Sequence, residues 1–206
     1  QSLGYQQSTQ RESIQCALAR KTGAILDEST FHPAVIEGVE RQARRHGMST
    51  SFVSLDFSDL DAVRPQVEGL IADPSAAIVL MGTELGEEDY ALFVNAAAHL
   101  IVLDGWSDRQ YFDAVVIANT DSVLRAVDYL IENGHKHLGY VAGELRIRNF
   151  KDRERGYRQA LEDAGLEANP TWRVTLGTTL EGAYRDMGTW LDSVSRDNLP
   201  PACFAE

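Results

Sequence analysis

Residues 112–166, FDAVVIANTDSVLRAVDYLIENGHKHLGYVAGELRIRNFKDRERGYRQALEDAGL, switch repeatedly between a strand pattern and a helix pattern. Strand and helix segments are expected here, in chain order, at 114–117, 121–131, 137–141 and 152–164. The two helical segments carry apolar residues on one face and end near Gly134 and Gly165, which suit helix C-termini. This alternation predicts parallel strands joined by right-handed helical crossovers.

The same alternation continues in both directions from this stretch. Upstream, strands are expected at 22–26, 51–55, 76–81 and 100–103, with helices at 35–46 and 60–71. Downstream, the pattern predicts a strand at 172–176, a helix at 180–191 and a strand at 202–205. The unbroken apolar run at 76–81 is typical of a strand that is buried on both faces of a parallel sheet. We therefore predict an α/β fold with a doubly wound parallel sheet.

The composition is that of a soluble globular protein with one large or two small domains. The formal net charge is −12, with 44% hydrophobic and 24% charged residues. No apolar run approaches the roughly 18–20 residues that a membrane span needs. The first residues, QSLGYQQSTQRES, lack the apolar core of a secretory signal, so we expect a cytoplasmic protein without membrane association. The acidic balance argues against a surface that coats nucleic acid.

Ligands of doubly wound sheets collect at the carboxyl ends of the strands. The segments that follow the expected strands are 27–31, 56–57, 82–84, 104–107, 119–121 and 142–153. None contains a phosphate loop, a dinucleotide turn, a zinc-binding helix or a nucleophile elbow. Cys16 and Cys203 show no metal-ligand spacing with the histidines. We therefore expect no catalytic residue, no metal site and no cofactor.

The order and spacing of several motifs carry a family resemblance. Asn119 follows a strand, LIENGH (130–135) and LGYVAG (138–143) come next, and RERGYRQAL (153–161) follows. Two upstream motifs are FHPAVIEGVERQARRHGMS (31–49) and HLIVLDGW (99–106). Together they resemble the effector-binding core of LacI/GalR-type bacterial transcriptional repressors. The resemblance implies a periplasmic-binding-protein-like type I fold of two Rossmann-like subdomains, truncated here at both ends.

The resemblance also implies a division into three parts. Residues 1–21 correspond to the end of a helix-turn-helix domain, marked by Leu3-Gly4-Tyr5, and a hinge linker. Residues 22–141 correspond to the first effector-binding subdomain. Residues 142–206 correspond to part of the second effector-binding subdomain.

The register of the first strand has two interpretations. If the strand lies at 22–26, Ile14 takes the hinge position that this family drives into the DNA minor groove. Glu12 then stands where the family usually has arginine, which is a departure from the pattern. In the competing register, residues 14–19 form the first strand and 20–31 form a long loop. The spacing from Tyr5 favours the first interpretation.

The resemblance implies that a small polar effector, usually a sugar or a sugar derivative, binds between the two lobes and changes operator affinity. The candidate effector-binding residues are Arg153, Asp104, Trp106, Phe31 and Asn119. Arg153 stands where the family places the arginine that grips the effector, and a guanidinium can donate two parallel hydrogen bonds to hydroxyls. Trp106 could stack on a sugar ring or serve as a packing residue. Asn119 could equally cap a helix.

The implied partners are a small-molecule effector, operator DNA through a preceding helix-turn-helix domain, and a second copy in a homodimer. Residues 34–46 and 92–98 are the expected pairing surfaces. We expect residues 1–206 alone to show no sequence-selective DNA binding in a mobility-shift assay. Two alternatives remain open: a sugar-binding protein of a transport system, and an enzyme built on the same sheet.

Overall fold

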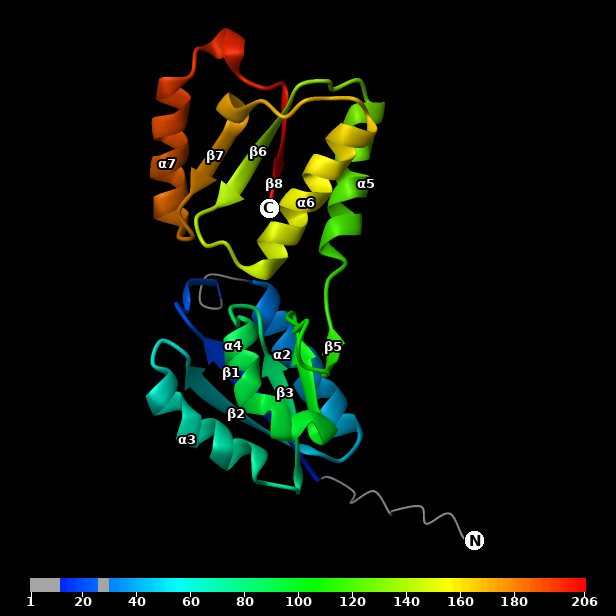
Figure 1. Cartoon of the computed structure of the whole chain (residues 1–206), viewed down its shortest axis with the longest axis vertical. Helices are drawn as coiled ribbons and strands as arrows, with labels where there is room; N and C mark the ends of the chain where they lie inside the picture. Colours follow the sequence, from blue (N-terminus) through cyan, green and yellow to red (C-terminus); the bar gives the residue numbers. More distant parts are fainter. Residues whose placement is uncertain (1–11, 26–29) are drawn as a thin grey trace, which may run out of the picture. The chain divides into compact units, whose positions relative to one another are not determined.

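The computed structural model describes residues 12–25 and 30–206. The chain divides into two compact units, residues 1–116 (unit 1) and 117–206 (unit 2). Each unit has its own parallel β-sheet and its own hydrophobic core (Figure 1). The predicted α/β fold with doubly wound parallel sheets is confirmed. The predicted Leu3-Gly4-Tyr5 motif lies outside the described residues.

Unit 1 contains a five-stranded sheet in the order β2-β1-β3-β4-β5. Its elements are β1 (Ser13–Arg20), α2 (Phe31–Arg45), β2 (Ser49–Asp56), α3 (Leu60–Ile71), β3 (Ala76–Met81), α4 (Glu87–Tyr90), the 3-10 helix η1 (Ala91–His99), β4 (Leu100–Leu103) and β5 (Asp113–Val115). The chain crosses the sheet in one direction through α2 and in the other through α3 and η1. Because such crossovers are right-handed, α2 covers one face and α3 and η1 cover the other.

Unit 2 contains a three-stranded sheet in the order β7-β6-β8. Its elements are α5 (Asn119–Glu132), β6 (Leu138–Gly143), α6 (Arg148–Asp163), the 3-10 helix η2 (Pro170–Trp172), β7 (Arg173–Leu176), α7 (Leu180–Ser193), the 3-10 helix η3 (Arg196–Asn198) and β8 (Ala202–Ala205). Helices α5 and α6 lie side by side (Figure 1). The chain moves in opposite directions across the sheet through α6 and α7, so these two helices cover opposite faces.

The first strand is not where the favoured register placed it. Strand β1 pairs in parallel with β2 on one side and with β3 on the other, while Thr22 and Gly23 form a bend. Gly23 has a φ of 78°, which interrupts an extended strand. Ile14 pairs with Thr50 and Ala77 in the sheet, so its prediction as a DNA hinge residue was wrong.

The boundary expected between residues 141 and 142 was also wrong. Strand β6 is the central strand of unit 2, where it pairs with β7 and β8. The expected first subdomain had included this strand. Apolar periodicity marks a buried strand but does not tell which sheet the strand joins. The change of unit comes between Val116 and Ile117, just after β5.

Candidate functional site

In unit 1, the strand order reverses at β1, with β2 on one side and β3 on the other. Ligands of such sheets bind at the carboxyl ends of the strands that flank this reversal. Residues 21–25 follow β1 at this edge, and residues 82–84 follow β3. We call the buried polar groups gathered here the unit 1 cluster: Thr83, Glu84, Asp104 and His32.

Glu84 joins the two strand ends through its carboxylate. The carboxylate accepts hydrogen bonds from the backbone N–H groups of Lys21 (2.8 Å), Thr22 (2.7 Å), Gly23 (3.1 Å) and Ile25 (3.1 Å). Burial by itself raises the pKa of Glu84, but these backbone donors outweigh it and hold the pKa below its ordinary value. The charged carboxylate therefore fixes the path of the chain after β1.

The rest of the unit 1 cluster brings together α2, β3 and β4. Thr83 donates from its hydroxyl to Asp104 over 2.8 Å, and its Oγ1 lies 3.0 Å from His32 Nε2. Nδ1 of His32 is buried and has no hydrogen-bond partner within the described part of the chain. The exposed ring of Phe31 meets the His32 ring edge-on at 5.3 Å. The unit 1 cluster and the neighbouring Phe31 thus combine a donor or acceptor nitrogen, a carboxylate and an aromatic ring.

Asp104 also has an unusual backbone. Its φ is 55°, and among residues 12–25 and 30–206 it is the one non-glycine residue with a positive φ. Such backbones cost roughly 1–3 kcal/mol and gather at ligand sites. The conformation turns the chain directly after β4, where the predicted Trp106 follows as a half-buried side chain.

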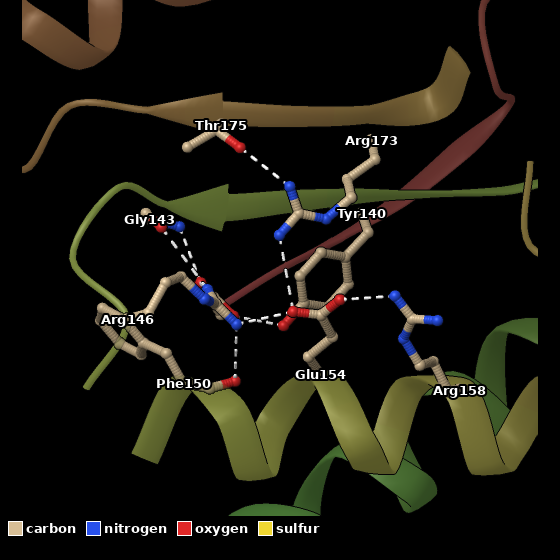
Figure 2. A network of polar contacts seen from close by, with 9 residues as sticks. Tyr140, Gly143, Arg146, Phe150, Glu154, Arg158, Arg173 and Thr175 are labelled. Atoms are coloured by element: carbon tan, nitrogen blue, oxygen red, sulfur yellow. Dashed lines mark hydrogen bonds and ion pairs between the residues drawn. The ribbon is translucent and has the colours of Figure 1, made fainter. Parts of the chain in front are cut away.

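In unit 2, the strand order reverses at β6, which lies between β7 and β8 in the sheet. Glu206, after β8, accepts hydrogen bonds from the Tyr140 hydroxyl and the Gly143 amide, and it forms an ion pair with Arg146 (Figure 2). Arg146 also contacts Glu154 Oε2 on α6 at 2.7 Å. Burial and the Glu206 carboxylate raise the pKa of Tyr140, so its hydroxyl stays protonated. These contacts tie the loop after β6 to β8 and to α6.

A second group in unit 2 lies where α5 and α6 begin. Arg153 donates from Nε to Asn119 Oδ1 over 2.8 Å, and Asn119 Nδ2 donates to Asn149 Oδ1 over 3.1 Å. The Arg153 guanidinium lies 5.4 Å from the centre of the Phe150 ring. Both asparagines are buried. Arg153 is therefore held in a defined position, whereas Arg155 on the same helix is exposed and pairs with Asp152.

The structure brings four of the predicted residues together in two groups: Asp104 and Phe31 in unit 1, and Asn119 and Arg153 in unit 2. Asp104 and Phe31 both contact the His32–Thr83 pair, and Asn119 contacts Arg153 directly. Their roles in effector binding stay predictions. The individual side chains that sequence reasoning missed are His32, Thr83, Glu84, Arg146, Asn149 and Glu206. The segments at 82–84 and 142–153 had been singled out, but not the side chains that turn inward there.

The described residues hold no cluster of three or more histidine, cysteine or acidic side chains suited to a metal ion. In the same part of the chain, no helix combines the length and the apolar character that a membrane span requires.

Comparison with known proteins adds sequence and fold relatives. A family model described as a periplasmic binding protein-like domain matches residues 127–206. The HTH-type transcriptional repressor PurR of Pasteurella multocida is 28% identical over 99% of this chain, which covers 61% of the relative's length.

Two solved structures share the fold. One is a sugar-binding LacI-family regulator from Escherichia coli complexed with phosphate, with a TM-score of 0.67, 17% identity, and coverage of 87% of this chain and 64% of the other. The other is a complex of the transcriptional regulator CelR with cellobiose, with a TM-score of 0.69, 20% identity, and coverage of 96% and 60%.

The two parallel sheets and the matched family model define a periplasmic-binding-protein-like α/β protein. Within that class, the motifs around residues 130–161 and the repressor relatives make the chain similar to the effector-binding core of LacI/GalR-type repressors. The relatives named above are transcriptional repressors and regulators.

Proposed function

We propose that this chain is the effector-binding region of a transcriptional repressor that senses a small polar molecule, and that operator DNA is bound through a helix-turn-helix domain. The observation that carries the proposal is the position of the buried polar groups. In unit 1 they gather where the strand order reverses, which is where doubly wound sheets bind ligands, and in unit 2 Asn119 and Asn149 gather where α5 and α6 begin. The fold relatives that are regulators support the same function.

A sugar or sugar derivative is the effector class that these groups suit. Asp104, Arg153 and Asn119 offer charged and amide groups for hydroxyls, while Phe31 and Trp106 offer aromatic faces for the apolar side of a ring. The cellobiose complex of CelR and the sugar-binding regulator from Escherichia coli support this class. An effector that binds one arrangement of the protein more tightly than another shifts the population and so changes DNA affinity.

A ligand screen followed by a DNA assay tests the proposal. The chain is screened by thermal shift against monosaccharides, disaccharides and purine bases, and the full-length protein is then tested on promoter fragments with and without each hit. We expect at least one hit that changes promoter binding and is recovered unaltered. A hit that is converted to product supports an enzyme instead. A hit that leaves promoter binding unchanged favours a transport role.

We expect Arg153→Ala to weaken binding of the sugar hit by at least tenfold. The guanidinium is held by Asn119, and a hydrogen bond to a charged group contributes about 1.5–3 kcal/mol. Titration calorimetry measures the effect. Arg155→Ala, on an exposed side chain of the same helix, is the matched control and should bind as the parent does. Equal affinity of the Arg153→Ala variant and the parent would contradict the assignment.

We also propose that the homodimer pairs through α7. The pairing surface expected at residues 92–98 offers Val94 as its exposed large apolar side chain, because Phe93 and Ala96 are buried in the unit 1 core. Helix α7 instead exposes Leu180 (84%), Tyr184 (84%) and Leu191 (44%), which the spacing places on one face. An antiparallel pairing centred between residues 188 and 189 would set Arg185 opposite the partner's Asp192, so charge complements the apolar stripe.

We expect Tyr184→Glu to weaken self-association by at least tenfold, because it places a charge in the centre of that stripe. Sedimentation velocity at rising concentration measures the dissociation constant. Tyr111→Glu is the matched control, since Tyr111 is 98% exposed and lies outside α7. If both variants associate as the parent does, the α7 stripe is not the pairing surface.

A further inference from the structure

A pocket of about 150 Å³ lies within unit 2, beside α6 and the start of β7. It is lined by Tyr140, Tyr157, Trp172, Pro170 and the arginines Arg158 and Arg173, with Glu154 among them. Arg153 and Asn119 do not line this pocket. The pocket is therefore distinct from the candidate effector-binding residues at the start of α5 and α6. A cavity on the order of 150 Å³ is large enough for a single benzene-sized ring.

The aromatic walls of this pocket are fixed in place. Tyr140 and Tyr157 lie 4.8 Å apart between ring centres, at an interplanar angle of 51°. The Tyr157 hydroxyl donates to the Leu138 carbonyl over 2.8 Å, and the Trp172 indole N–H donates to the Asn198 carbonyl over 2.7 Å. Because each polar tip is already bonded, the rings present a preformed apolar surface. Binding then costs little ordering of side chains.

The charges at the pocket do not balance. Arg158 and Arg173 both reach the Glu154 carboxylate, at 2.8 Å and 3.5 Å, from α6 and from β7 (Figure 2). Burial by itself raises the pKa of Glu154, but the hydrogen bond from Arg158 and the charges of Arg173 and Arg146 outweigh it and hold the pKa below its ordinary value, so the group is ionised. Arg146 has a second carboxylate partner in Glu206. Two guanidinium groups thus share one carboxylate, which leaves one positive charge uncompensated.

From this combination we infer a second ligand site that takes a small planar aromatic monoanion, such as an aryl carboxylate. The ring lies against Tyr140, Tyr157 and Trp172. The carboxylate accepts from the guanidinium groups of Arg158 and Arg173, which each carry more donors than Glu154 uses. A flat ring and a single negative charge match the shape and the charge of the pocket together. The inference rests on unit 2 alone and does not depend on the proposed effector.

Benzoate is the probe for this site, and ligand-observed NMR titration measures its dissociation constant. Benzamide has the same shape without the charge, and cyclohexanecarboxylate has the charge without the aromatic ring. We expect benzoate to bind at least tenfold more tightly than either analogue. We expect Arg173→Gln to weaken benzoate binding at least tenfold, and Arg158→Gln to weaken it in the same direction.

Arg125→Gln is the matched control, because Arg125 is an exposed arginine on α5 outside the pocket. It should bind benzoate as the parent does. Circular dichroism confirms that each variant is folded. Equal binding of benzoate and benzamide, or parental benzoate affinity in both Arg173→Gln and Arg158→Gln, would overturn the inference. Displacement of benzoate by a sugar hit would place benzoate at the candidate effector-binding residues Arg153 and Asn119. That result would overturn the inference as well.

Discussion

Glu84→Gln is expected to destabilise unit 1 by about 3 kcal/mol, the largest effect of any single substitution proposed for this unit. The buried carboxylate accepts from the backbone N–H groups of residues 21, 22, 23 and 25. A carboxamide can accept only through its oxygen, and its NH₂ group meets N–H donors. With the amide oxygen in the place of Oε2, the NH₂ group faces the Ile25 N–H, so at least this backbone donor loses its partner and the other three lose a charged acceptor.

The loss of stability caused by Glu84→Gln should also depend on pH in a defined direction. The pKa of Glu84 is lowered in the folded protein from an ordinary value of 4.5. A carboxyl whose folded pKa is depressed contributes stability above the unfolded pKa, and this contribution disappears as the pH falls through the folded pKa. The difference between the parent and Glu84→Gln is therefore expected to be constant above pH 4.5 and to shrink at lower pH.

Hydrogen exchange at increasing urea concentration, read on peptides from β1 and β3, measures the stability of unit 1 separately from unit 2. Peptides that contain residues 21–25 should also lose protection under native conditions in the variant. Glu88→Gln is the matched control, because Glu88 is an exposed acid on the adjacent helix α4. It should change stability by less than about 0.5 kcal/mol. A parental stability for Glu84→Gln at neutral pH would show that the carboxylate does not anchor the loop.

Most of the fold could be predicted from periodicity alone, because the strands and helices after residue 30 are strongly patterned. Strand 76–81 and strand 202–205 were predicted with their observed bounds. Strand β1 matches the competing register, 14–19, which was not the favoured one for a physical reason. Its sequence, SIQCALAR, begins and ends with polar residues and is buried through small side chains such as Ala17 and Ala19, so it lacks the β-branched signal of a core strand.

The candidate site could be predicted as a set of segments but not as a set of contacts. Asp104 and Asn119 follow strands and are buried, as the topology rule requires. The role of Glu84 in the structure depends on a turn that brings the chain after β1 over the end of β3. The contacts of Glu206 with the loop after β6 depend on the pairing of β6 with β8. Both contacts join residues more than 60 positions apart, and no local pattern reports such a pairing.

Gly156→Ala is expected to destabilise unit 2 by about 2 kcal/mol, although helix propensity alone predicts the opposite sign. Gly156 lies inside α6, where replacing glycine with alanine ordinarily stabilises by about 1 kcal/mol. At Gly156, however, α5 passes too close to α6 to leave room for a methyl group. A Cβ on Gly156 would lie 2.5 Å from the Thr120 carbonyl oxygen and 3.1 Å from the Val123 Cβ. The first contact is with backbone, which cannot rotate away as a flexible side chain can.

The glycine of the R-x-x-G-Y motif is therefore explained by the close packing of α5 against α6. Urea-dependent hydrogen exchange on peptides from these two helices measures the predicted loss. Gly188→Ala is the matched control, because Gly188 also lies inside a helix of unit 2 and a Cβ there meets no atom within 4 Å. It should stabilise unit 2 by about 0.5–1 kcal/mol at low protein concentration. Opposite signs for the two substitutions establish the close approach of the helices, whereas a stabilising Gly156→Ala would mean that α5 and α6 separate easily enough to admit a methyl group.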